Sequence, residues 1–299
     1  PIKEISGKIA NIQRAATGID RIQNFLNDIP HRITISMTDS YQKIPFQKMK
    51  VDLDYFEYPK RKGAEGSDRK TFSLADIHFE GFPGELIGIV GLSGSGKSTL
   101  LNILAGNILA PDADVSLLMG TPEAGYKLHL RDLDEYRKEV SIVSQESHIF
   151  SESLMFNITL KRIRPDDFVE NWNFLLDNIP YLKTWGLAPD DLVIPSSLSL
   201  GQRQLLAGVR ACYIKKNIVF FDEISSALDS DLEYALRKLV LLIQEFSLTV
   251  IVAHRVETII NADKILVMDK GRVIDSGKHA ALIARSAVYQ DFIRELSHS

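Results

Sequence analysis

The sequence has very little of several features that would restrict it to a special class of protein. It contains one cysteine, Cys212, in 299 residues. A single cysteine cannot form an internal disulfide framework and suits a reducing compartment. No second cysteine and no nearby histidine accompanies Cys212 to form a metal site, so we interpret it as a buried packing residue in a helix. No apolar run approaches the roughly 18 to 20 residues that span a bilayer, and Pro1–Glu4 does not begin a signal peptide.

An excess of charge of one sign is also lacking. Lysine and arginine total 35 against 39 aspartate and glutamate, which gives a net charge of −4. This balance provides no global basic field for nucleic acid, although a local patch remains an alternative. The hydrophobic content of 45% and charged content of 25% are ordinary for a globular protein. The length allows one large α/β domain or two small ones.

The most informative stretch of the chain is Gly91–Thr99, which reads Gly-Leu-Ser-Gly-Ser-Gly-Lys-Ser-Thr. It matches G-x-x-x-x-G-K-[ST] and lies between an apolar strand, Leu86–Val90, and the start of a helix, Leu100–Leu104. Such a loop curls backbone N–H groups around phosphate oxygens at a helix N-terminus. The alternative is an ordinary Gly/Ser-rich turn before a helix, but the complete motif in this context favours phosphate binding. We expect the phosphates to contact Gly91, Ser93, Gly94, Ser95, Gly96, Lys97, Ser98 and Thr99.

The rest of the chain alternates apolar strands with helices. Strands are expected at 49–58, 72–79, 114–119, 139–144, 217–221, 248–253, 264–268 and 271–275. Residues 232–246 and 280–296 have helical periodicity, and about 146–216 is mostly helical, with prolines breaking it into short helices. The alternation predicts an α/β fold with a mostly parallel, doubly wound sheet and an inserted helical region.

We expect two parts, a linker helix and connector over 1–48 and the α/β domain over 49–299. Isoleucines at spacings of three and four place an apolar stripe along residues 1–29. This helix either packs on the protein's own core or needs a partner, and the sequence favours neither reading.

A pair of acidic residues elsewhere in the chain narrows the range of reactions that the phosphate loop could support. Phe220-Phe221-Asp222-Glu223 places two carboxylates at the end of a buried strand, the edge where ligands gather in parallel sheets. Asp222 suits Mg²⁺ held through its water shell, and Glu223 could act as the general base that activates water for attack on a γ-phosphate. An acidic helix N-cap is the alternative. The phosphate loop elsewhere in the chain favours the catalytic reading.

Taken together with the motifs below, the sequence resembles the nucleotide-binding domain of an ATP-binding cassette (ABC) protein. Leu198-Ser199-Leu200-Gly201-Gln202-Arg203-Gln204 resembles the signature motif that distinguishes this family from other phosphate-loop ATPases. Four further matches follow the family's order over about 49–299. They are Tyr58 for the aromatic residue on adenine, Gln145 for the Q-loop, Ser226-Ala227-Leu228-Asp229 for the D-loop, and His254 for the switch histidine. Tyr55 or Phe56 could be the stacking ring instead of Tyr58.

The resemblance implies a P-loop (RecA-like) sheet with an antiparallel β subdomain and a helical subdomain at about 146–216. It also implies ATP and Mg²⁺ as ligands. Glu223 would be the base, His254 and Lys97 would stabilise transferring charge, and Ser98, Gln145 and Asp222 would hold the metal. Two cassettes would meet head to tail, so that Ser199, Gly201 and Gln202 of one complete the ATP site of the other. One departure is Leu200, where the family usually has glycine; the side chain either points away or weakens this half-site.

The sequence also resembles cassettes of ABC exporters, in which ATP-driven dimerisation powers export. Residues 1–29 resemble the end of a membrane domain fused before the cassette, which would place a transmembrane domain upstream of Pro1. The chain would then lie at the cytoplasmic face of an inner or plasma membrane, and we expect no nucleic acid partner. The alternative is a soluble ABC ATPase that acts on nucleic acid or ribosomes. Such proteins usually carry long coiled coils or tandem cassettes, and this sequence shows neither.

Overall fold

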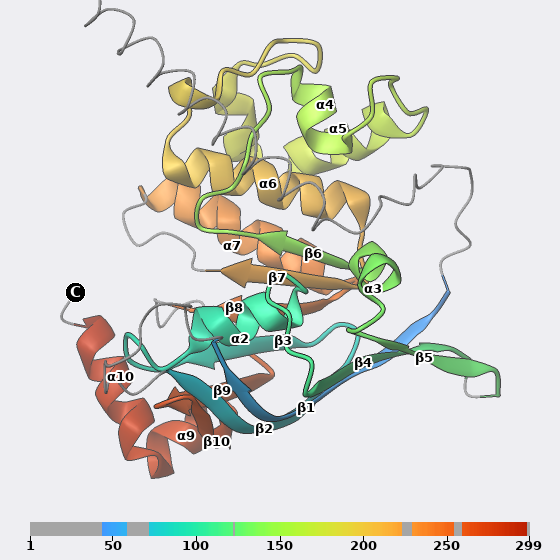
Figure 1. Cartoon of the computed structure of the whole chain (residues 1–299). Helices are drawn as coiled ribbons and strands as arrows, with labels where there is room; N and C mark the ends of the chain where they lie inside the picture. The colour runs from blue at the N-terminus through green and yellow to red at the C-terminus, as the bar shows by residue number, and fades with distance from the viewer. Residues whose placement is uncertain (1–43, 59–71, 122, 223–228, 254–258, 298–299) are drawn as a thin grey trace, which may run out of the picture. The chain divides into compact units, whose positions relative to one another are not determined.

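The computed structural model describes residues 44–58, 72–121, 123–222, 229–253 and 259–297 (Figure 1). The chain divides into two compact units, Pro1–Lys43 and Ile44–Ser299. All the described helices and strands belong to the second unit. The predicted helix over 1–29 lies outside the described residues, as do the loop Lys60–Lys70, Glu223 and His254.

A six-stranded sheet forms the centre of this unit, with the order β10-β9-β3-β8-β7-β6. Its strands are β3 (Leu86–Val90), β6 (Val140–Val143), β7 (Ile218–Asp222), β8 (Leu248–Val252), β9 (Lys264–Asp269) and β10 (Arg272–Gly277). All neighbours are parallel except β9 and β10, which form an antiparallel hairpin. Every residue of β3 and β8 is buried, as expected for strands covered on both faces. The predicted mostly parallel α/β sheet is therefore confirmed.

A second, antiparallel sheet has the order β2-β1-β4-β5. Its strands are β1 (Phe46–Glu57), β2 (Ser73–Gly81), β4 (Ala113–Gly120) and β5 (Gly125–His129). Helix α2 (Lys97–Leu104) shares one hydrophobic core with this sheet and with one face of the central sheet, through Ile87, Ile89 and Phe220. Alternate residues such as Val219 and Phe221 enter the other core, because side chains alternate across a strand. The antiparallel β subdomain expected from the resemblance is thus present.

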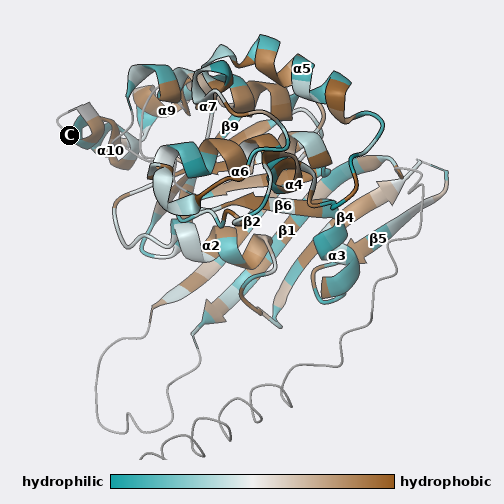
Figure 2. Cartoon of the chain, turned by 90° about the horizontal axis from the view of Figure 1, so that it is seen from above, coloured by the Kyte–Doolittle hydropathy of each residue, from teal (hydrophilic) through white to brown (hydrophobic). Residues whose placement is uncertain are grey.

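The segment between β6 and β7 is helical. It contains α4 (Leu154–Thr159), α5 (Phe168–Asn178), the 3₁₀ helices η1 (Pro180–Trp185) and η2 (Pro195–Ser197), and α6 (Leu200–Ile214). Pro180 and Pro195 each begin a short 3₁₀ helix, which fits the predicted role of proline as a break. Figure 2 shows that α5 has both hydrophobic and hydrophilic residues, as expected for a surface helix that turns one face to the core and the other to solvent. The limits of a helical subdomain at 146–216 stay a prediction, as does the boundary between 48 and 49.

The sequence misplaced some smaller elements. The single closing helix expected over 280–296 is wrong, because the structure has two helices, α9 (His279–Arg285) and α10 (Ala287–Ser297). Ser286 leaves the helical region at φ −98° and ψ 105°, and its hydroxyl accepts a hydrogen bond from the Tyr289 N–H at 3.4 Å. Strand β5 and helix α3 (Leu133–Glu139) were missed, because each buries only one or two side chains and so has no clear apolar period.

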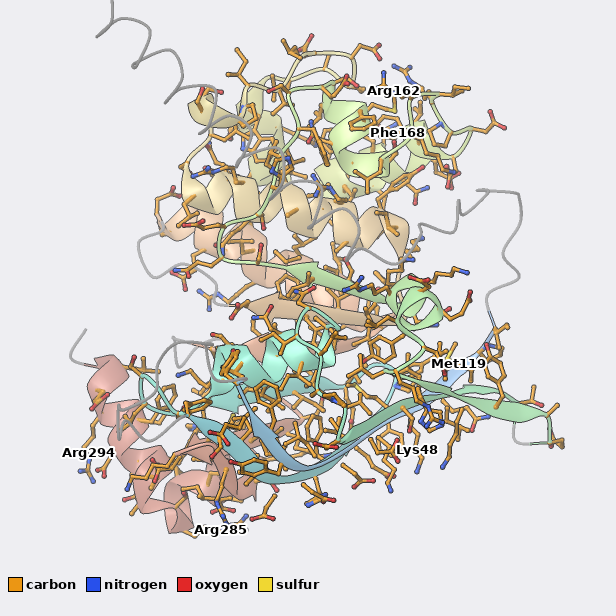
Figure 3. All side chains as sticks on the ribbon, in the orientation of Figure 1. Lys48, Met119, Arg162, Phe168, Arg285 and Arg294 are labelled. Atoms are coloured by element: carbon orange, nitrogen blue, oxygen red, sulfur yellow. The ribbon has the colours of Figure 1, made fainter. Side chains whose placement is uncertain are left out.

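Helix α7 (Ser230–Gln244) follows β7 and packs against α6 in the larger core. The C-terminal helices α9 and α10 lie at the opposite end of the unit from α4 and α5 (Figure 1). Figure 3 shows Arg285 and Arg294 on the outer side of these two helices. Within the described ranges, no helix is both long and apolar enough to cross a bilayer.

Candidate nucleotide-binding site

The loop between β3 and α2 depends on three glycines in distinct ways. Gly91, Gly94 and Gly96 have φ values of +148°, +78° and +107°, which favour glycine. A Cβ atom at Gly91 would lie 2.2 Å from the backbone oxygen of Met268 on β9, and one at Gly96 would lie 2.6 Å from a Leu74 methyl carbon. At Gly94 no atom lies within 4 Å of the corresponding position. Packing therefore requires glycine at 91 and 96, whereas Gly94 faces open space.

Lys97 is the first residue of α2 and is 6% exposed. Its Nζ atom donates to the backbone oxygen of Gly91 at 2.8 Å and to that of Leu92 at 3.1 Å. The Ser95 N–H donates to the same Leu92 oxygen at 3.1 Å. In the described part of the chain, the buried Ser95 hydroxyl has no hydrogen-bond partner. The lysine thus ties the two ends of the loop together and holds it in a curled form.

A hollow of about 400 Å³ opens in front of this loop. Its walls are Tyr58, Phe72, Ser93, Gly94, Gly96, Lys97, Ser98 and Thr99. The hydroxyl oxygens of Tyr58 and Thr99 are 3.3 Å apart, and Tyr58 packs edge-on against the ring of Phe56. Phe56 itself is buried in the core, and Tyr55 bonds to Glu57 and does not line the hollow. Of the three rings considered from the sequence, Tyr58 alone faces the phosphate loop.

Phe72 also lines the hollow, and sequence reasoning missed it. The only available signal was its place as the first apolar residue before β2, which suggested a strand and nothing more.

A slightly larger hollow, of about 460 Å³, lies elsewhere, against residues 108–115 and 129–131. It contains none of the predicted site residues and no helix N-terminus. The hollow beside Gly91–Thr99 is therefore the stronger candidate for a nucleotide site.

The acidic end of β7 lies at the same edge of the sheet as the phosphate loop. Strands β3, β8 and β7 are neighbours and parallel, so their carboxyl ends meet there. Among the described residues, the buried Oδ1 atom of Asp222 has no hydrogen-bond partner. Gln145 is exposed, two residues after the end of β6, which pairs with β7.

Mg²⁺ binds oxygen ligands and keeps several waters. The unpartnered Asp222 oxygen, the exposed Ser98 hydroxyl at the start of α2 and the Gln145 amide offer such oxygens at one edge of the sheet. These residues fit a magnesium ion held mostly through water. Within the described ranges, no group of three or more histidine, cysteine, aspartate or glutamate side chains could hold a metal.

The predicted signature motif forms the N-terminus of α6. Ser199 is the N-cap, and its hydroxyl accepts from the Gln202 N–H at 3.2 Å, while Oε1 of Gln202 accepts from the Ser199 N–H at 3.0 Å. This reciprocal capping box fixes the helix start. Ser199 is exposed and Gly201 is buried. None of Ser199, Gly201 and Gln202 lines the hollow of the phosphate loop.

Leu200, the residue that departs from the usual signature motif, is half-buried. It lines a separate hollow of about 590 Å³ with residues 146–151, Pro195 and Arg203. The structure therefore brings Tyr58 together with Ser93, Gly94 and Gly96–Thr99, whereas Gly91 and Ser95 are buried and do not line the hollow. The signature motif lies apart from this hollow, with Leu200 in the lining of the second one. Glu223 and His254 lie outside the described residues, and the D-loop is described only at Asp229, which caps α7 by accepting from the Leu232 N–H at 2.9 Å.

Comparison with known proteins agrees with this geometry. The family model described as ABC transporter matches residues 74–226, slightly more than half of the chain. The chain is 33% identical to the "ABC-type transporter fsqE" of Aspergillus fumigatus, over 80% of this chain and 18% of that protein. It is 31% identical to the "ATP-dependent lipid A-core flippase" of Pseudomonas aeruginosa and 30% identical to that of Saccharophagus degradans, over 97% of this chain and 46% and 47% of those proteins.

A solved structure described as a bacterial Atm1-family ABC exporter with ATP bound has the same fold. It superimposes with a TM-score of 0.68 and 21% sequence identity, over 95% of this chain and 48% of that one. The chain thus spans about half the length or less of the relatives that it matches. The family match covers more than half of the chain, and the phosphate loop, the capped signature helix and the acidic strand end follow one another in the expected order. This chain therefore belongs to the ABC transporter family.

Proposed function

We propose that the chain is the ATP-binding and hydrolysing cassette of an ABC exporter. The observation that supports this most directly is the hollow in front of Gly91–Thr99, which combines a curled glycine-containing loop at a helix N-terminus, a buried lysine and an aromatic wall. An anionic phosphate suits the N-terminus of α2, and a purine ring suits Tyr58. The exporter class rests on the lipid A-core flippases and the Atm1-family exporter to which the chain is similar.

In this proposal the nucleotide lies along the loop. The phosphate oxygens contact backbone N–H groups from Gly91, Ser93, Gly94, Ser95 and Gly96, with the side chains of Ser98 and Thr99 beside them. Lys97 exchanges its bonds to the loop carbonyls for the phosphates, which keeps its charge compensated as ATP enters. Tyr58 stacks on the adenine, and Phe72 closes the same wall.

Hydrolysis needs a base and groups that stabilise the charge of the transferring phosphoryl group. Glu223 takes the proton of the attacking water, and His254 and Lys97 face the developing negative charge. Gln145 orients that water and, with Ser98 and Asp222, holds Mg²⁺. The metal, when bound, neutralises charge on the β- and γ-phosphates.

A single chain provides half of each site in this proposal. Ser199, Gly201 and Gln202 of a second cassette complete the site from the other side, so ATP closes the dimer and hydrolysis releases it. The separation of the signature helix from the phosphate-loop hollow in one chain supports this arrangement. A transmembrane domain, fused before this segment, would be driven by the cycle from the cytoplasmic face of the membrane.

The proposal is tested with two substitutions and two matched controls. Lys97→Ala should lose ATP affinity in calorimetry, and Glu223→Gln should bind ATP and form a dimer in sedimentation while hydrolysing it at least about a hundredfold more slowly. Lys238→Ala and Glu135→Gln, at exposed positions of α7 and α3, should behave like the unsubstituted chain. Near-normal hydrolysis by Glu223→Gln would remove Glu223 from the role of base. ATPase activity that depends on added RNA would favour the nucleic-acid alternative over export.

A further inference from the structure

Helix α6 turns one face toward the short segment Glu146–Ser151, which begins directly after Gln145. Leu200 and Arg203, in its first turn, line a hollow together with this segment. Arg210 lies seven residues after Arg203, two turns along the same face. Its Nη2 atom donates to the backbone oxygen of His148 at 3.2 Å. One helix face therefore borders the segment across a hollow near the signature motif and bonds to it two turns further on.

Arg210 also ties this segment to α4. Its Nε atom donates to the backbone oxygen of Asn157 at 2.7 Å, and its guanidinium lies 5.5 Å from the centre of the Phe150 ring. The side chain of Asn157 is fully buried and bonds to the backbone of Phe150. Its Oδ1 accepts from the Phe150 N–H at 2.8 Å, and its Nδ2 donates to the Phe150 oxygen at 2.9 Å. The backbone from 148 to 150 is thus fixed to both helices.

The position of Arg210 carries a desolvation cost that an apolar residue would not have. Burial lowers the pKa of its guanidinium, and no carboxylate in the described part of the chain offsets that cost. An unpaired, desolvated charge destabilises a fold unless hydrogen bonds compensate it. Here the compensation comes from two backbone oxygens on separate segments, which an apolar side chain could not bridge. The guanidinium therefore serves as a link between segments rather than as packing.

We infer that this face of α6 couples the two halves of the nucleotide machinery, with Arg210 as a positioning residue for Gln145. This inference rests on the proposed function. Ser199 at the start of α6 would meet the nucleotide of a second chain, whereas Gln145 serves the nucleotide of its own chain. Arg210 lies eleven residues after Ser199, about 16 Å along the helix. When ATP engages Ser199, the helix moves as one body, and Arg210 carries 146–151 with it, and so shifts the adjoining Gln145.

The test uses Arg210→Met and Arg210→Lys, with Arg237→Met at an exposed position of α7 as the matched control. Thermal unfolding first selects variants that fold. For Arg210→Met we expect the ATP dissociation constant to stay within about twofold, since the phosphate loop is untouched. The turnover number should fall by about threefold to thirtyfold, the range of typical coupling effects, and the Hill coefficient for ATP should fall toward one. Arg210→Lys keeps the charge but loses the two-pronged guanidinium group, so its turnover number and Hill coefficient should lie between those of Arg210→Met and the unsubstituted chain.

Hydrogen exchange provides a second readout. Amides of 146–151 should exchange faster in Arg210→Met than in the unsubstituted chain, while those of α2 should not change. The inference is overturned if Arg210→Met keeps normal turnover and cooperativity, or if affinity, turnover and thermal stability all fall together. Absence of ATP hydrolysis by the unsubstituted chain would instead refute the proposed function, and the inference with it, before any variant is compared.

Discussion

Gly91 and Gly94 belong to the same loop, yet the structure predicts opposite consequences for a single added methyl group. At Gly91 the methyl carbon would lie 2.2 Å from the Met268 oxygen and 2.8 Å from the Ser95 hydroxyl. The first of these atoms is backbone in β9, which pairs with both β3 and β10 and cannot move aside cheaply. At Gly94 the methyl group would meet no atom within 4 Å. Gly91→Ala should therefore damage the fold, and Gly94→Ala should damage the site.

The magnitudes follow from the two positions. For Gly91→Ala, a disfavoured backbone conformation costs about 1–3 kcal/mol and an overpacked contact about the same again, so the loss is roughly 2–6 kcal/mol. This is a large part of the typical total stability of about 5–15 kcal/mol. Gly94→Ala carries only the backbone cost of φ +78°, roughly 1–2 kcal/mol. Its methyl group would occupy the hollow, so ATP affinity should fall about tenfold, or ~1.4 kcal/mol.

Urea unfolding without nucleotide measures the first quantity, and calorimetric titration with ATP measures the second on the same preparations. Gly186→Ala is a useful control, because Gly186 also has a positive φ of +62° with no atom within 4 Å, but it lies far along the chain from the loop. It should lose stability like Gly94→Ala and keep normal ATP affinity. The steric reasoning fails if Gly91→Ala is no less stable than Gly94→Ala. Normal ATP binding by Gly94→Ala would show that the hollow is not the phosphate site.

Two further predictions concern groups outside the site. Burial raises the pKa of the Cys212 thiol to about 11, so iodoacetamide at pH 8 should leave it unmodified until the chain is unfolded; mass spectrometry showing rapid labelling of the folded chain would contradict this. Hydrogen bonds from Arg285 hold the pKa of Asp275 below its usual 3.8, so this stabilisation is present above that pH and is lost as the pH falls through the lowered value. Asp275→Asn should therefore unfold more easily by up to about 1 kcal/mol at pH 7, and urea unfolding should show the difference shrinking below about pH 4.

The parts of this structure that could be predicted from sequence are those that a short local pattern determines. The strand before Gly91 is continuously apolar because both faces of β3 are covered, and the loop follows from its own glycines. Strands β7 and β8 are likewise almost entirely apolar. Strand β5 escaped prediction because three of its five residues are exposed, and α3 because five of its seven residues are charged. Where an element buries little, no period in the sequence marks it.

The remaining features depend on contacts between distant segments. The need for glycine at 91 comes from the Met268 carbonyl, which lies far along the chain. Phe72 and Tyr58 are not adjacent in the sequence, and only the fold brings both beside the phosphate loop. The Arg210 bonds to His148 and Asn157 join three segments of the helical region. No sequence spacing encodes such contacts, so a local reading identifies the phosphate loop but not its supports.

Leu200, the departure from the usual signature motif, is where this difference matters most. The sequence left two readings, a side chain that points away or one that weakens the half-site. The structure places Leu200 against the hollow beside 146–151 and leaves the exposed Ser199 in an intact capping box. The leucine therefore faces the hollow between α6 and that segment, and it does not cover the serine.

Leu200→Gly tests this placement, since it restores the usual residue of the family. Removal of a half-buried side chain and the low helix propensity of glycine should together lower the free energy of unfolding by about 1–2 kcal/mol. Turnover of ATP should not rise, because nothing that obstructs Ser199 has been removed. Leu200→Met is the matched control, since it keeps an apolar side chain of similar volume and should behave like the unsubstituted chain. A marked gain in turnover by Leu200→Gly would mean that the leucine hinders the signature motif, and would refute the placement argued from the structure.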